Sequence, residues 1–199
     1  AFSMLSGMIS QQGALGAGGS VGLRTSWSKS GHRAARLTTH AILNSQPTLS
    51  IMLPGPSSRR IGFEFTFNLG ANIQDITLYT YIYKQDGYGE HEAFLRVLPQ
   101  SAQLAYQDSV ENFVSLAGLG TRPMPSFRYT MKMVIDQEAR QYVRSYLSGI
   151  VYPMNRKAYR ALPQSTQYNY ILVQIIATPS TAASNVVSID DFILTDNAP

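Results

Sequence analysis

The sequence predicts an all-β protein in which two antiparallel sheets pack around one core. The clearest observation is the segment 61–69, where Ile, Phe, Phe, Phe and Leu occupy every second position. This period of two is typical of a strand with one buried face, and three phenylalanines on that face require a second apolar layer opposite them. Similar alternating segments, separated by turn residues, recur along the 199 residues. We therefore expect about nine to eleven strands and little helix.

The first 22 residues contain no charged side chain and include a glycine- and alanine-rich tract from Gly13 to Gly22. This tract does not resemble a phosphate-binding loop, because no Gly-Lys-Ser/Thr follows it. We expect residues 1–22 to form an irregular N-terminal arm that packs on a neighbouring subunit, since its apolar side chains need to be covered. Residues 23–199 are expected to form a single domain. The arm residues predicted to mediate assembly are Phe2, Met4, Leu5, Met8 and Ile9.

The domain is expected to alternate between strands and turns along its whole length. Pro54-Gly55-Pro56 and Asp86-Gly87 are strong turn signals, and the second predicts a hairpin. Segment 109–119 is expected to be a short helix or an irregular loop. The nearly continuous apolar run 168–177 predicts a central strand covered on both faces. In chain order, the predicted strands are 21–27, 36–43, 49–53, 61–69, 75–84, 93–98, 127–135, 141–147, 168–177 and 186–194.

Two stretches carry aromatic side chains at alternate positions. Tyr79, Tyr81 and Tyr83 point to one side of their strand, opposite its aliphatic residues. Flat aromatic surfaces of this kind bind sugars, although aromatic β-propensity and cross-strand packing explain the pattern equally well. The second stretch would form a basic, aromatic sheet face, for which a solvated outer surface is the alternative. Its residues are Arg128, Lys132, Tyr142, Arg144 and Tyr146.

Charged residues make up 14% of the chain, below the usual share of roughly 25%. Such a surface meets another protein or an uncharged ligand, or is simply rich in Ser, Thr, Gln and Asn. Residues 1–60 contain six basic and no acidic residues, but the bases are singly spaced, which disfavours nucleic acid. The absence of cysteine excludes disulfides and thiolate metal sites. No apolar run reaches the ~18 residues of a membrane-spanning helix.

The carboxylates form no recognisable catalytic set, and we expect neither an enzyme nor a cofactor. Glu90 and Glu92 would lie about 7 Å apart on one strand face, a spacing that permits acid–base chemistry, but solvated charges fit this glycine-rich hairpin end as well. His91 between them would point the opposite way. Asp190 and Asp191 are a weak calcium candidate, with a local hydrogen-bonding role as the alternative. No Gly-x-Ser-x-Gly nucleophile elbow is present.

Three segments carry a resemblance to a known fold family. They are Arg60-Ile-Gly-Phe-Glu-Phe65, Tyr129-Thr-Met-Lys-Met-Val-Ile-Asp136 and Val187-Ser-Ile-Asp-Asp-Phe-Ile-Leu194. These resemble strands of jelly-roll domains of the concanavalin A-like lectin/glucanase type. The resemblance implies a two-sheet antiparallel jelly-roll β-sandwich. Glucanases of this type carry a Glu-x-Asp-x-x-Glu motif, which this sequence lacks.

These observations predict a non-enzymatic structural, assembly or adhesion protein, such as a virion decoration or fibre protein or a surface-appendage subunit. It would be a homo-oligomer or part of a larger assembly, located outside the cell or on a virion surface. The alternative is a carbohydrate-binding module that uses a tyrosine-rich sheet face, with Arg96, Arg128 or Arg144 binding sugar hydroxyls. An unusual glycosidase that uses Glu90 and Glu92 is the third hypothesis.

Overall fold

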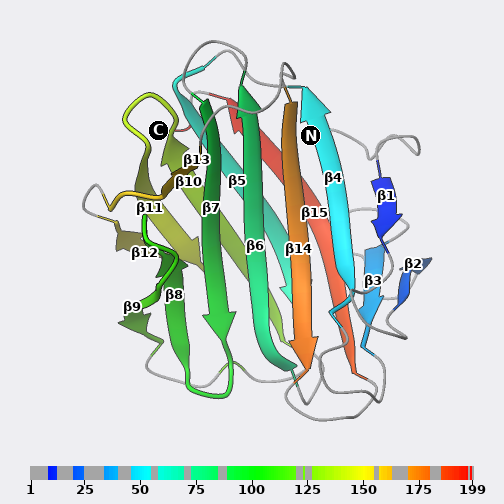
Figure 1. Cartoon of the computed structure of the whole chain (residues 1–199). Coiled ribbons are helices and arrows are strands. Elements are labelled where there is room, and N and C mark those ends of the chain that lie inside the picture. The colour runs from blue at the N-terminus through cyan, green and yellow to red at the C-terminus, as the bar shows by residue number, and fades with distance from the viewer. Residues whose placement is uncertain are drawn as a thin grey trace.

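The protein is a sandwich of two antiparallel sheets, which we call sheet A and sheet B; Figure 1 shows sheet A in front of sheet B. The predicted all-β class is confirmed, and the described residues contain no helix. It follows that they include no helix long and apolar enough to cross a membrane. The computed structural model describes residues 9–12, 20–24, 34–39, 46–54, 58–69, 73–84, 89–119, 123, 127–154, 157–162, 170–179, 185–196 and 198.

Sheet A contains eight strands, and strands distant in the chain lie next to each other within it. In spatial order it consists of β1 (Ile9–Gln12), β4 (Thr48–Pro54), β14 (Tyr170–Pro179), β6 (Ile73–Lys84), β7 (Gly89–Leu98), β8 (Gln103–Gln107) and β9 (Phe113–Gly118). A further short strand, β13 (Arg160–Leu162), pairs with β7 beside β8. The same edge of β7 therefore pairs with two strands, β13 and β8.

Sheet B contains seven strands. In spatial order they are β12 (Ile150–Pro153), β11 (Gln141–Leu147), β10 (Arg128–Asp136), β5 (Arg60–Asn68), β15 (Val186–Asp196), β3 (Ala34–Thr38) and β2 (Ser20–Arg24). The chain passes repeatedly between the two sheets, because β4 and β14 belong to sheet A while β5 and β15 belong to sheet B. This alternation is the jelly-roll arrangement that the resemblance implies.

The core lies between the sheets and is centred on β5, as the period of two predicts. Phe63, Phe65 and Phe67 are fully buried, and the rings of Phe65 and Phe67 lie 5.6 Å apart. Sheet A supplies the opposing layer, which includes Leu78 and Val173. On the other face of β5, Gly62 allows close approach of the C-terminal segment and of β10. A Cβ at this position would lie 3.1 Å from both Ala198 Cβ and Lys132 Cε.

The segment 109–119 differs from the expectation of a helix or irregular loop. It is the turn and second strand of the β8–β9 hairpin. Asp108 closes this turn, because its Oδ1 accepts the backbone N–H groups of Val110 and Asn112 at 3.0 and 2.9 Å. Glu111 adopts a positive φ of 70° in the turn. A side chain that satisfies two backbone donors fixes a tight reversal in place of a helical turn.

The expectation that the apolar run 168–177 is covered on both faces is wrong. β14 does lie inside sheet A, but its side chains alternate between buried and half-buried along its length. Tyr170, Leu172 and Gln174 point to the outer face of sheet A. Apolar composition therefore predicts the central position of β14 correctly, although nothing among the described residues covers its second face.

The N-terminal segment contributes two backbone pairings. β1 pairs with β4 at the edge of sheet A, and β2 pairs with β3 at the edge of sheet B. The predicted boundary between residues 22 and 23 falls within β2. The division into an arm (1–22) and a domain (23–199) stays a prediction. The assembly residues Phe2, Met4, Leu5 and Met8 lie outside the described residues, and Ile9 is described by its backbone alone.

Candidate functional site

The face of sheet A that points away from sheet B brings together side chains from six strands; we call it the outer face of sheet A. Antiparallel pairing places partner residues opposite each other on strands about 4.8 Å apart. Two rows of outward-pointing residues therefore cross the middle of the sheet. The first row contains Met52, Leu172, Tyr81, Glu92 and Arg160. The second row contains Ser50, Gln174, Tyr79 and Phe94.

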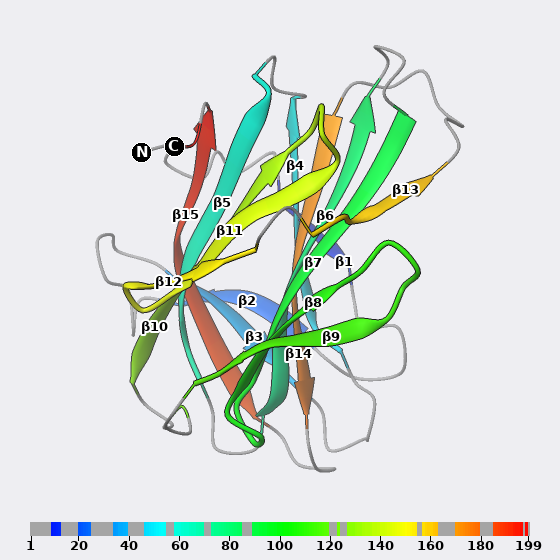
Figure 2. The same ribbon diagram turned by 90° about the vertical axis from the view of Figure 1, so that its left-hand side faces the viewer.

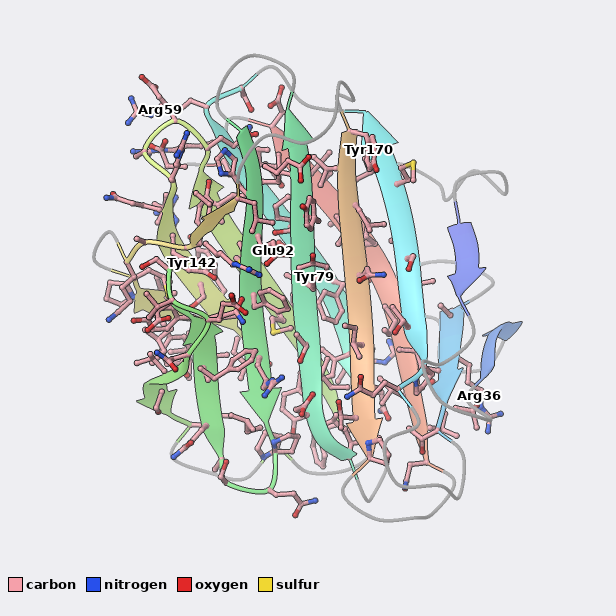
Figure 3. The ribbon with its side chains drawn as sticks, in the orientation of Figure 1. Arg36, Arg59, Tyr79, Glu92, Tyr142 and Tyr170 are labelled. Atoms are coloured by element: carbon pink, nitrogen blue, oxygen red, sulfur yellow. The ribbon has the colours of Figure 1, made fainter. Side chains whose placement is uncertain are left out.

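Two tyrosine–carboxylate hydrogen bonds lie at the centre of this face. The Tyr79 hydroxyl donates to Glu92 Oε1 at 3.0 Å, and the Tyr81 hydroxyl donates to Glu90 Oε2 at 2.5 Å. Each bond joins diagonal neighbours on β6 and β7, and Figure 3 shows Tyr79 and Glu92 on these adjacent strands. Tyr79 and Tyr81 lie on the face of β6 opposite its aliphatic residues, as their alternation predicts; this is the outer face, and both side chains are half-buried. The side chain of Tyr83 lies outside the described residues.

Arg160 connects two separate segments, β13 and the β8–β9 turn, that meet beside β7. Its Nη1 lies 2.8 Å from Glu92 Oε2, and its Nη2 lies 2.8 Å from Glu111 Oε1 in the β8–β9 turn. The hydrogen bond to Glu92 raises the pKa of Arg160, so the guanidinium stays charged. Figure 2 shows β13 and the β8–β9 hairpin projecting on the outer side of sheet A. The bridge therefore borders one side of this face.

Aromatic rings form a continuous platform next to the carboxylates. The ring of Tyr79 lies 4.3 Å from that of Phe94, which lies 6.0 Å from Phe113. The guanidinium of Arg96 stacks 3.7 Å from the centre of the Phe113 ring. Phe113 is 40% exposed, so one side of its ring faces solvent.

Asp75 and Thr77 hold Arg96 from the opposite side. Arg96 Nε donates to Thr77 Oγ1 at 3.2 Å and lies 4.0 Å from Asp75 Oδ2. Burial raises the pKa of Asp75, and the nearby Arg96 partly opposes this shift. Arg96 is thus positioned by a hydroxyl, a carboxylate and an aromatic ring.

Tyr142 does not share a face with Arg144 and Tyr146, so that expectation is wrong. Between Val134 and Ile135 the pairing of β10 with β11 shifts, and Tyr142 pairs with Ile135 while Arg144 pairs with Val134. The extra residue of this bulge turns Tyr142 into the core, where it is fully buried. Burial raises the pKa of its hydroxyl far above the usual value, which keeps the proton in place.

The buried Tyr142 hydroxyl supports the outer face of sheet A from behind. It accepts the backbone N–H of Phe94 at 2.9 Å and donates to the carbonyl of Gln107 at 2.9 Å, with the Phe94 carbonyl at 3.2 Å. Along β7, Glu92 pairs with β13 and Leu95 pairs with β8. Tyr142 therefore completes the hydrogen bonding at the position where the edge of β7 passes from one partner strand to the other.

Sequence patterns do not single out three residues of this face, namely Glu111, Phe113 and Arg160. The first two lie in the segment expected to be a helix or loop, and Arg160 belongs to a basic stretch that reads as a solvated turn. The inward pointing of Val114 and Leu116, which alternate with the exposed Phe113 and Ser115, is the signal that would have revealed β9. β13 is three residues long, too short to show a period.

No family model matches the chain, and neither does any curated protein. Solved structures do resemble it. The endo-β-1,4-glucuronan lyase of the fungus Trichoderma reesei has a TM-score of 0.63 at 10% identity, covering 97% of this chain and 92% of the lyase. Cellulose-induced protein Cip1 has a TM-score of 0.59 at 12% identity, covering 94% and 89%. A variant of alginate lyase Aly36B in complex with an alginate trisaccharide has a TM-score of 0.57 at 8% identity, covering 96% of this chain and 99% of the lyase.

These likenesses are at low identity and concern the fold. The chain has a concanavalin A-like jelly-roll fold. The resemblance carried by segments 60–65, 129–136 and 187–194 is therefore confirmed at the level of the fold. In this jelly roll the three segments lie on β5, β10 and β15, which are adjacent strands of sheet B.

The prediction that the chain is not an enzyme is contradicted by these comparisons. It relied on the absence of recognisable catalytic sets, among them the Glu-x-Asp-x-x-Glu motif of the glucanases. Two of the three jelly rolls described above are lyases, which cleave by a different reaction. The absence of a hydrolase motif therefore does not exclude an enzyme on this fold.

The remaining aromatic and basic candidates lie on the opposite side of the jelly roll, on the outer face of sheet B. Lys132 Nζ lies 5.7 Å and Arg144 Cζ lies 5.8 Å from the ring centre of Tyr146, and Arg128 is exposed at the start of β10. Lys132 also pairs with Glu64 at 3.6 Å. The predicted glycan residues are thus divided between two faces, and the tyrosine–carboxylate pairs lie on one of them alone.

The calcium candidate and the histidine lie in settings other than a metal site. Asp190 Oδ1 accepts the N–H of Asp191 at 2.9 Å, and Asp191 has a positive φ of 50° in a bulge of β15. This is the local hydrogen-bonding role given above as the alternative to calcium. His91 points into the core, with its ring 5.7 Å from Tyr159. Within the described ranges no three His, Cys, Asp or Glu residues group closely enough to hold a metal ion.

A cavity of about 610 Å³ lies at the end of the sandwich, away from Tyr79 in Figure 3, where Arg59 is labelled. Its centre is an ion-paired carboxylate: Asp136 Oδ2 lies 2.8 Å from Arg59 Nε and 3.7 Å from Arg60 Nε, and Asp136 Oδ1 accepts the Ala139 N–H at 2.9 Å. Burial alone would raise the pKa of Asp136, but the Ala139 N–H and Arg59 outweigh it and lower the pKa.

Because of this lowered pKa, the free energy of unfolding depends on pH and falls in acid. Asp136→Asn is expected to reduce the free energy of unfolding by about 1–2 kcal/mol at pH 7, because charge-assisted hydrogen bonds are lost. A carboxyl whose pKa falls on folding stabilises the protein above roughly pH 4, and this contribution disappears as the pH falls through the lower value. Urea unfolding should therefore show a difference in the free energy of unfolding between Asp136→Asn and the unsubstituted protein at neutral pH, and a smaller difference at roughly pH 3. An unchanged difference would contradict this role.

Proposed function

We propose that the outer face of sheet A binds a polysaccharide chain. The observation that carries this proposal is the continuous platform of Tyr79, Phe94 and Phe113 beside the Glu92–Arg160 pair. Aromatic rings pack against the apolar C–H faces of sugars, and ionised carboxylates accept strong hydrogen bonds from hydroxyl groups. A few polar groups at an apolar surface fix the orientation of a ligand.

The second row of residues extends the polar side of this surface. Gln174 Nε2 donates to Ser50 Oγ at 3.0 Å, on the far side of Tyr79 from β7. Ser50 is only 1% exposed, so its hydroxyl orients the amide, and the half-buried Gln174 amide is the group that can supply a donor and an acceptor to sugar hydroxyls. The rings, carboxylates and amide together cross β14, β6, β7 and β9, so an extended chain of several sugars fits the face better than a single sugar.

The comparisons support this proposal at the level of the ligand class. Two similar jelly rolls are named as lyases for glucuronan and alginate, which are both polysaccharides. This chain carries a polar and aromatic surface on one outer sheet face, and the predicted carbohydrate-binding alternative used residues of the same face, Tyr79 and Tyr81.

Phe113→Ala is the variant that tests the proposal. We expect it to weaken binding to the best ligand of a polysaccharide array by about tenfold, since an exposed aromatic ring in a binding surface contributes on the order of 1–2 kcal/mol. Phe127→Ala is the matched control, because Phe127 is also exposed, at 56%, and lies directly before β10 of sheet B. Calorimetric titration measures both. Equal affinities in the two variants, or no ligand on the array, would overturn the proposal.

Cleavage of the bound chain is a second candidate function. The observation that favours it is the placement of Glu90 and Glu92 on one face, each hydrogen bonded to a tyrosine hydroxyl. Carboxyl and phenol groups are the types that donate or accept protons in such reactions. Mass spectrometry of the ligand after incubation separates the two functions, because an intact chain indicates binding alone and shortened chains indicate an enzyme.

Self-association and location remain predictions from the sequence. The low charge of the chain and the apolar residues of segment 1–22 are what motivate a homo-oligomer or a larger assembly outside the cell or on a virion surface. Light scattering at two protein concentrations measures the mass in solution. A monomer at both concentrations would remove self-association from the functional account.

A further inference from the structure

We infer that the outer face of sheet A selects an uncharged polysaccharide over a polyuronate. This inference rests on the proposed function and concerns the substrate class of the same site. It follows from how the charged side chains of the face are already paired. The two similar lyases are named for polyuronates, so the charge of the ligand is a property in which this chain would differ from them.

The arginines of this face are committed to partners within the protein. Arg160 contacts two carboxylates, Glu92 and Glu111, both at 2.8 Å. Arg96 is stacked on Phe113, bonded to Thr77 and placed 4.0 Å from Asp75. A guanidinium that recognises a sugar carboxylate presents its paired N–H groups to it. Here the Nη1 and Nη2 edges of Arg160 point to glutamates.

Carboxylates outnumber guanidiniums in the described part of this face. Asp75, Glu90, Glu92 and Glu111 stand against Arg96 and Arg160, but Asp75 and Glu90 are only 2% and 3% exposed, so Glu92 and Glu111 are the carboxylates that a ligand would meet. A polyuronate carries one carboxylate on each sugar, so the sugars next to Glu92 and Glu111 would bring like charges together. Like charges that face each other across an interface act against the wrong ligand. An uncharged chain meets the same acceptors as hydrogen-bond partners.

The test compares ligands that differ in charge alone. Hexasaccharides of β-1,4-glucan, β-1,3-glucan and β-1,4-mannan are each measured beside the counterpart oxidised to a carboxylate at C6. We expect at least one uncharged hexasaccharide to bind, and its oxidised counterpart to bind at least about tenfold more weakly. Equal or tighter binding of the oxidised form would overturn this inference and leave the proposed function standing. Binding of none of the six would overturn both.

Glu111→Gln tests the physical cause. Glu111 is 56% exposed at its side chain and sits in a surface turn, so the substitution leaves the fold intact while it removes one of the two carboxylates on Arg160. We expect the affinity for the oxidised hexasaccharide to rise about three- to tenfold relative to the affinity for the uncharged one. Glu138→Gln is the matched control, because Glu138 is equally exposed and pairs with Arg59 at the cavity. If both variants raise the affinity equally, net charge is responsible and the pairing of Arg160 is not.

Discussion

Phe65→Ala is expected to lower the free energy of unfolding by about 3–5 kcal/mol, the largest effect of any substitution considered. Phe65 is fully buried at the centre of β5, between Phe63 and Phe67, and it pairs across the sheet with Met131. Removing its ring deletes buried apolar surface and leaves a cavity that neighbouring side chains on two rigid sheets cannot fill. Thermal unfolding should show the same loss as a fall in Tm of roughly 6–20 °C for a domain of this size.

Phe127→Ala is the control for this prediction as well. The Phe127 ring is 56% exposed, so its removal is expected to change the free energy of unfolding by less than about 0.5 kcal/mol. Urea titration of both variants against the unsubstituted protein gives the comparison. Similar losses in the two variants would mean that the rings on β5 do not form the centre of the core.

The central strands could be predicted from the sequence because each has one fully buried face. The period of two in segment 61–69 corresponds to β5, and the same pattern in segments 75–84 and 127–135 corresponds to β6 and β10. In such a strand a register shift of one residue would expose every apolar side chain, so the pattern determines the orientation of the strand. The strength of this signal comes from burial, and it weakens where burial is partial.

The elements that the sequence did not reveal are the short or half-exposed ones. β1, β12 and β13 have three or four residues, which is too few for a period to be visible. β9 alternates over only a few residues and its inward side chains are only half-buried, so its pattern is weak. Their positions depend on contacts with distant strands, as in the pairing of β13 with β7.

The residues of the candidate site also divide into those that a periodic strand pattern predicts and those that it does not. Tyr79, Tyr81, Glu90 and Glu92 lie on long, regular strands, and their shared face follows from the period alone. Tyr142 was misplaced because one inserted residue in a strand exchanges its two faces, and bulges leave no clear signal in a single sequence. Contacts between separate segments, such as Arg160 with Glu111, require the topology to be known.

Tyr142→Phe is expected to lower the free energy of unfolding by about 2–3 kcal/mol, more than the loss of an ordinary surface hydrogen bond. The substitution removes only the hydroxyl oxygen, so no cavity of consequence forms. It leaves the N–H of Phe94 and the carbonyl of Gln107 without the bonds that Tyr142 now makes to them. A buried backbone group that loses its partner destabilises the fold by about 1–3 kcal/mol. The Phe94 amide should also exchange with solvent faster than in the unsubstituted protein, which hydrogen-exchange NMR measures residue by residue.

Tyr146→Phe is the matched control, because Tyr146 lies four residues along the same strand but is half-buried on the outer face of sheet B. Its hydroxyl is expected to contribute less than about 0.5 kcal/mol. If Tyr142→Phe is equally mild and the Phe94 amide stays protected, the edge of β7 is held by its flanking strands and not by the tyrosine. If the predicted loss is found, Tyr142 joins the core to the surface on which Phe94 is displayed. In that case the bulge that turns Tyr142 inward is as much a part of the binding face as the tyrosines that point outward.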